Sequence, residues 1–117
     1  MTRRIHKLLY DVWLSLEQIT EFVADTPNFA AYQNSPLTQG AVNWHLIIVG
    51  EATNKLRQED PSVTLPEAKR IVGLRNRLVH AYDDVDAGTV WDILQVHLPA
   101  LKADVRHRID AFEATMP

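Results

Sequence analysis

The 117-residue sequence contains no cysteine. Disulfides, thiolate nucleophiles and cysteine-ligated metals are therefore excluded, and their absence is what we expect of a cytoplasmic protein. No apolar run approaches the roughly 18 residues of a membrane span. The basic residues 1–7 precede apolar residues at helical spacing, so we expect neither an export signal nor a membrane partner.

The sequence also lacks strand-like alternation, internal repeats and low-complexity tracts. Its hydrophobic fraction of 46% and charged fraction of 23% are those of an ordinary globular protein. The length predicts one domain over residues 1–117. A net charge of −3 argues against a nucleic-acid-binding surface over the whole molecule but allows a local basic patch.

Apolar residues three and four positions apart predict four long amphipathic helices and one short helical turn. Their expected ranges are 2–24, 29–33 (the short turn), 36–58, 65–82 and 87–114. Short loops between long helices favour an antiparallel bundle. The predicted fold class is therefore all-α, an antiparallel bundle of four long helices plus a short helical turn.

Several residues mark the expected helix ends. Ser35, followed by proline, is a typical N-cap. Thr64 and Glu67 match a capping box, in which Glu67 would reach back to the cap. Proline at position 99 cannot continue regular helix bonding, so we expect the last helix to kink near Gln95.

A charged side chain interrupts the apolar stripe of the third long helix. Arg75 lies at the centre of this stripe, and Tyr82 lies at its end. A guanidinium is costly to bury without a partner. Either an acid such as Glu51 neutralises Arg75, or the stripe opens onto an interface or a cleft.

Arg75, Asn76 and His80 are the side chains that a metal-independent ribonuclease needs. Histidine transfers protons near neutral pH. Arginine can hold a phosphate through two hydrogen bonds and stabilise charge that develops on it. Asn76 could orient the imidazole or the phosphate. Since RNA carries its own 2′-hydroxyl nucleophile, we expect neither a metal nor a cofactor.

The placement of these residues on one helix limits how they can act together. Arg75 and His80 lie about 140° apart around an ideal helix. They can converge if the helix frays near Val79, or if a second copy of the chain supplies the opposite pair across a two-fold axis. The local basic surface that RNA needs would come from Lys69, Arg70 and Arg77.

Residues 75–82 match R-x4-H-x-Y, the signature of HepT-like toxins of the HEPN superfamily. Asparagine directly after the arginine is also typical of these toxins. The resemblance extends to residues 44–56, which are similar to the second long helix of the family, and to residues 71–76. It continues through residues 85–101, so that nearly the whole chain resembles a HepT-like ribonuclease.

This resemblance implies a homodimeric, all-α endoribonuclease toxin in which Arg75 and His80 of both chains line a cleft at the dimer interface. It implies an RNA substrate and a second partner, a minimal nucleotidyltransferase antitoxin. The antitoxin would silence the toxin by adding AMP to Tyr82. A phosphate ester two residues from His80 would bring negative charge and bulk to the place where the RNA phosphate must lie.

Each of these residues also has an ordinary structural interpretation. Arg75 could form a salt bridge to Glu51, and Glu51 could equally be solvated. His80 could bond a carbonyl at the end of its helix or lie near the negative end of the helix dipole. Tyr82 could be a core ring with its hydroxyl at the rim, and Asn76 a plain surface residue.

Three further alternatives remain at this point. His80 with Asp83 or Asp84 could hold a divalent metal, although so few ligands on a turn do not define a site. The chain could be a non-catalytic module that binds nucleotide or RNA and partners a nucleotidyltransferase, or a structural bundle that dimerises through this helix. The three tryptophans fall on apolar stripes and are expected in the core rather than as base-stacking platforms: Trp13, Trp44 and Trp91.

Overall fold

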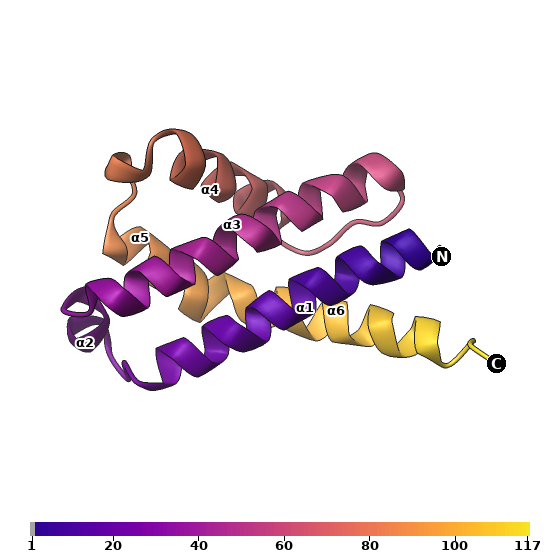
Figure 1. Ribbon diagram of the computed structural model, residues 1–117, viewed down its shortest axis with the longest axis horizontal. Coiled ribbons are helices and arrows are strands. Elements are labelled where there is room, and N and C mark those ends of the chain that lie inside the picture. Colours follow the sequence, from indigo (N-terminus) through magenta and orange to yellow (C-terminus); the bar gives the residue numbers. More distant parts are fainter. Residues whose placement is uncertain (1) are drawn as a thin grey trace.

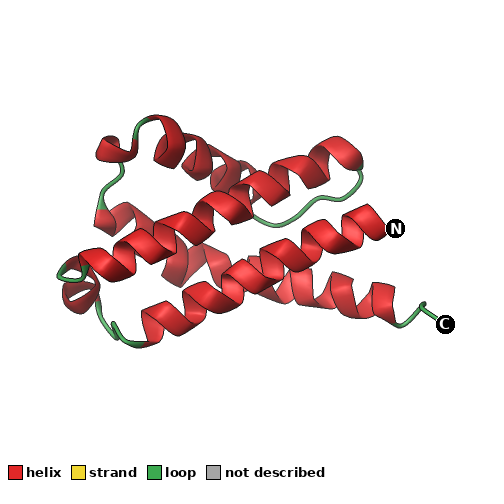
Figure 2. Cartoon of the chain, viewed as in Figure 1, coloured by secondary structure: helices red, strands yellow, loops and turns green. Residues whose placement is uncertain are grey.

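The computed structural model describes residues 2–117. Within that range the chain consists of helices and loops, without a strand (Figure 2). The all-α prediction is therefore confirmed. The α-helices are α1 (Arg3–Ala24), α2 (Phe29–Gln33), α3 (Pro36–Glu59), α4 (Ala68–His80), α5 (Ala87–Asp92) and α6 (Leu98–Glu113).

The long helices form an elongated bundle of 47 × 27 × 19 Å (Figure 1). Helices α1 and α3 run antiparallel and pack against each other. Helix α4 packs on α3, and α6 packs on α1. Both chain ends lie at one end of the long axis, whereas the connection between α4 and α5 lies toward the opposite end (Figure 1).

Side-chain caps fix most of the helix starts. The Ser35 hydroxyl accepts a hydrogen bond from the amide of Thr38 at 3.3 Å, as expected for an N-cap. Asn28 caps the short helix α2, which occupies the predicted range 29–33. These caps satisfy amide groups that a helix leaves without internal partners. Their local chemistry explains why the predicted and observed starts agree closely.

The start of α4 differs from the prediction, and the expected capping box is wrong. Glu67 has a left-handed backbone, with φ of 63°, and no side chain caps the helix. Its carboxylate instead accepts from Arg70 Nε at 2.9 Å and lies 3.1 Å from His97 Nδ1. The carbonyl of Thr64 accepts from Arg108. Arg70 within the helix and the tertiary partners His97 and Arg108 therefore take the place of the expected capping box.

The last predicted helix is interrupted by the π-helical segment η2 (Ile93–His97). Pro99 lacks an N–H group, so the carbonyl of Gln95 loses its usual partner four residues later. The amide of Leu98 donates instead to the carbonyl of Ile93, five residues back, as in a π-helix. Regular α-helical bonding is therefore broken around Gln95, where the sequence predicted a kink, and the π-helical segment joins α5 to α6 without a loop.

One continuous core joins all the long helices. Trp13 and Trp91 are partly buried and pack against it, as predicted. Trp44 is 62% exposed, so its predicted place in the core is wrong. Its neighbours Val42 and Leu46 occupy the inward face of α3, and two residues along a helix turn a side chain by about 200°. No helix in the described part of the chain has the length and apolarity to cross a membrane.

Candidate active site

Arg75 lies at a close approach between α3 and α4. Gly50 of α3 is buried, and a Cβ atom built on it would collide with Arg75 Cβ and lie 2.9 Å from Arg75 Cγ. The same atom would lie 3.1 Å from the carbonyl oxygen of Ile71. The lack of a side chain at Gly50 therefore makes room for the stem of Arg75 between the two helices.

The guanidinium of Arg75 has no acidic partner among residues 2–117. Its Nη1 donates to Oδ1 of Asn76 at 3.0 Å, whereas its Nε is buried and has no hydrogen-bond partner. Glu51 is exposed and pairs with Lys55 at 3.4 Å. Within residues 2–117 Arg75 forms no ion pair, so the salt bridge to Glu51 that the sequence allowed is not formed. Position 51 follows Gly50 by about 100° around α3 and points away from Arg75.

His80 is the last residue of α4 and is exposed. No other side chain or carbonyl in the described residues bonds its ring. The helix stays regular through Val79, so the fraying that could bring Arg75 toward His80 does not occur. The two side chains remain about 140° apart around the helix. One chain alone therefore does not bring Arg75 and His80 together.

Tyr82 lies beyond the end of α4, in the short 3-10 turn η1 (Tyr82–Asp84). The residue after α4, Ala81, has φ of −152° and ψ of 48°, which lie outside the helical region. The Tyr82 side chain is 75% exposed, so the alternative of a core ring is wrong. Its hydroxyl is accessible to an external reagent or enzyme.

The three candidate RNA-binding cations have different surroundings. Arg77 Nη2 donates to the backbone carbonyl of Asp84 at 3.1 Å. Arg70 is paired with Glu67. Lys69 is exposed and forms no ion pair within residues 2–117. A free phosphate would therefore meet the least competition at Lys69.

The acidic residues after the motif belong to the turn and the next helix. Asp83 and Asp84 are exposed, and Asp86 accepts from the amide of Thr89 at 2.7 Å as the N-cap of α5. That backbone hydrogen bond is the main reason that the pKa of Asp86 is lowered. In residues 2–117 the structure brings no three His, Asp or Glu side chains into an arrangement that could hold a metal.

Two relationships at this site were not predicted from sequence. The packing of Arg75 against Gly50 joins two helices, and the sequence does not show which residues meet there. The bond from Arg77 to Asp84 joins residues seven apart across a helix end. It depends on how the chain turns at Ala81, for which the sequence carries no local signal.

Comparison with known proteins shows which family the chain belongs to. Residues 14–108 match the family described as Ribonuclease HepT-like. The chain belongs to this HepT-like ribonuclease family, of the HEPN type. The match includes the whole of α3, α4 and η1, and therefore every candidate site residue named above.

Individual relatives agree with the family match. The chain is 33% identical over 107 residues to "Putative RNase MJ1380" of Methanocaldococcus jannaschii, covering 88% of this chain and 94% of that one. It is 32% identical over 105 residues to "Probable ribonuclease HepT" of Thermococcus cleftensis, covering 86% and 92%. No solved structure matches the chain.

Proposed function

We propose that this HepT-like chain is a metal-independent endoribonuclease and the toxin of a cytoplasmic toxin–antitoxin pair. It acts as a homodimer in which Arg75 and His80 of two chains face one RNA phosphate. Its partner is a minimal nucleotidyltransferase that silences it by adding AMP to Tyr82. Membership of a ribonuclease family supports the reaction class, and the arrangement of the site supports the finer assignments.

The observation that carries the proposal is the divergence of Arg75 and His80 on a helix that remains regular between them. The pair can act on one phosphate only if a second chain brings its own pair to the same place. Two exposed apolar side chains support such an arrangement. Trp44 on α3 is 62% exposed and Val79 on α4 is 43% exposed, and these two helices pack against each other. Tryptophan is among the residues enriched in the buried centres of interfaces.

The chemistry requires only groups that two copies of the chain supply. One His80 takes the proton of the RNA 2′-hydroxyl as its oxygen attacks phosphorus. The bond from phosphorus to the 5′-oxygen breaks, and a protonated His80 from the other chain gives that oxygen a proton. The products are a 2′,3′-cyclic phosphate and a 5′-hydroxyl. Arg75 stabilises the extra negative charge on the phosphate oxygens in the transition state.

Asn76 positions the guanidinium for this task. Its side-chain oxygen accepts from Arg75 Nη1 and therefore restricts the direction in which the remaining N–H donors point. The buried, unpartnered Nε of Arg75 leaves that guanidinium short of hydrogen bonds. A bound phosphate would satisfy donors that water serves in the free protein.

Tyr82 is suited to its proposed role as the site of control. Its side chain is exposed on a turn directly after His80, so a transferase can reach the hydroxyl without unfolding α4. An AMP group adds a negative phosphodiester and a nucleoside there. Both repel or displace an RNA phosphate at the cleft.

Substitution of His80 tests the catalytic assignment. We expect His80→Ala to reduce RNA cleavage by about 10²–10⁴-fold, the usual contribution of general acid–base catalysis. His107→Ala is the matched control, because His107 is also exposed on a helix. Cleavage is measured on purified protein with a chelator present, together with circular dichroism and analysis of the RNA ends.

Undiminished cleavage by folded His80→Ala would refute the role of His80. RNA or nucleotide binding without cleavage by the unmodified wild type would instead favour the non-catalytic partner of a nucleotidyltransferase. Activity that disappears on chelation and returns with a divalent metal would refute the metal-independent mechanism.

A further inference from the structure

The turn that carries Tyr82 is joined to α4 by one side chain. Arg77, in the last turn of α4, donates from Nη2 to the carbonyl oxygen of Asp84 at 3.1 Å. The backbone carbonyl of Arg77 accepts from the amide of Ala81 at 2.7 Å. Arg77 therefore holds both the first residue after the helix and the last residue of η1.

The turn has few other attachments. Its internal bonds run from the Asp84 amide to the Ala81 carbonyl at 2.9 Å, and from the Val85 amide to the Tyr82 carbonyl at 3.1 Å. Tyr82, Asp83 and Asp84 are all exposed, and none of the turn residues is buried. With so little packing, the turn depends on hydrogen bonds for its order.

We propose that Arg77 is a positioning residue that holds the Tyr82–Asp84 turn in place, rather than an RNA phosphate contact. It thereby fixes where the Tyr82 hydroxyl is presented to a modifying nucleotidyltransferase. The modification part of this inference rests on the proposed function. The effect on the turn does not, because it concerns the free chain alone.

The geometry separates Arg77 from a phosphate-binding role. The Arg77 guanidinium is bonded to a carbonyl. To bind a phosphate it must break that bond or use its other N–H groups. Lys69 lies on the same helix, is exposed and has no such commitment. If both residues served RNA alone, neutralising either one would weaken binding in the same way and leave the turn unchanged.

Amide hydrogen exchange of the free protein tests the positioning role directly. In Arg77→Gln we expect the amides of Asp84 and Val85 to exchange at least about fivefold faster than in wild type, because a bond from a charged donor is lost. Amides in the middle of α4 should keep their rates. Lys69→Gln is the matched control, with wild-type exchange in the turn. Unchanged exchange of both turn amides in Arg77→Gln would overturn the inference.

A second measurement follows AMP transfer by intact mass, in the presence of ATP and the proposed nucleotidyltransferase partner. We expect Arg77→Gln to gain AMP about fivefold or more slowly than wild type, since a disordered acceptor must be ordered on binding. Its KM for RNA and the salt dependence of binding should match wild type, whereas Lys69→Gln should raise KM.

The two experiments can fail separately. Absence of AMP on wild-type protein would refute the proposed control at Tyr82 and leave the exchange result to judge the role of Arg77. A raised KM and a shallower salt dependence in Arg77→Gln, with wild-type exchange and modification, would show that Arg77 contacts RNA instead.

Discussion

At the scale of single residues, His45 is a titratable group whose charged form is disfavoured by folding. It lies on α3, and its Nδ1 is hydrogen-bonded to the hydroxyl of buried Ser15 on α1 at 3.0 Å. The ring of Phe22 packs beside it, with ring centroids 5.7 Å apart. Burial lowers the pKa of His45 below its ordinary value of 6.5, because the protonated ring loses hydration.

This lowered pKa predicts how stability changes with pH. Well above pH 6.5, His45 is neutral in both the folded and the unfolded chain. As pH falls through 6.5, the unfolded chain takes up a proton first, so the free energy of unfolding decreases until the folded-state pKa is passed. Chemical denaturation of wild type and His45→Asn at about pH 7.5 and pH 5.5 measures the difference.

We expect wild type to lose more stability than His45→Asn over that interval. The asparagine amide can replace the bond to Ser15 but does not titrate. All other residues are identical in the two proteins, so their contributions cancel in the comparison. Equal losses in the two proteins would contradict the prediction.

At the scale of helices, the contact between α3 and α4 depends on the absence of one side chain. Replacement of Gly50 by alanine would place a methyl group against Arg75 and the Ile71 carbonyl. The helices must then separate, or the stem of Arg75 must move. We expect Gly50→Ala to lower the free energy of unfolding by about 1–3 kcal/mol and to reduce RNA cleavage as well.

Gly40 provides a matched control on the same helix. A Cβ atom built on Gly40 meets nothing within 4 Å. Gly40→Ala should therefore raise the free energy of unfolding by about 0.5–1 kcal/mol, since alanine favours helix more than glycine does. Denaturation and cleavage assays on both variants measure these effects. Similar stability changes in the two variants would show that the close approach at Gly50 does not constrain the helices.

The helices themselves were largely predictable because their signals are local. Spacing of apolar residues and the Ser35 cap place α1, α2 and α3 within about one residue of their observed ends. The start of α4 was not predictable, because Glu67 is held by His97, which lies thirty residues away along the chain. Sequence patterns describe neighbours along the chain but not such tertiary partners.

The candidate site was predictable in composition but less so in geometry. The R-x4-H-x-Y pattern selected Arg75, His80 and Tyr82, and their positions on one element followed from helical spacing. The apolar stripe suggested that Tyr82 is inside, whereas the chain leaves the helix at Ala81 and exposes it. An apolar stripe predicts which side chains are buried only as far as the helix continues.

At the scale of the whole molecule, the exposure of Trp44 on α3 and of Val79 on α4 predicts self-association. We expect Trp44→Arg to raise the Kd of the proposed dimer by at least about tenfold. A tryptophan that becomes buried when two proteins associate is a typical interface anchor. RNA cleavage should fall in parallel and recover at higher protein concentration. Sedimentation equilibrium and concentration-dependent cleavage measure both effects.

Val96→Arg is the matched control, because Val96 is equally exposed at 62% but lies in the η2 segment between α5 and α6. It should leave the dimer and its activity unchanged. A Trp44→Arg protein that is still dimeric and fully active would place the interface elsewhere.

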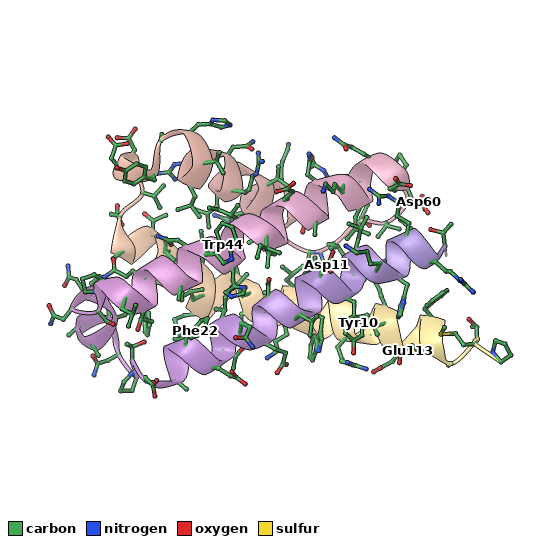
Figure 3. All side chains as sticks on the ribbon, viewed as in Figure 1. Tyr10, Asp11, Phe22, Trp44, Asp60 and Glu113 are labelled. Carbon is green, nitrogen blue, oxygen red and sulfur yellow. The ribbon has the colours of Figure 1, made fainter. Side chains whose placement is uncertain are left out.

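The position of the chain ends has a practical consequence. Both ends lie together at one end of the long axis, and the segment between α4 and α5 lies toward the other (Figure 1). Side chains near the ends, such as Glu113, are therefore well separated from Trp44 on α3 (Figure 3). A fluorescent label or an affinity tag at either end can therefore test the proposed assembly and AMP transfer without occupying the surfaces proposed for them.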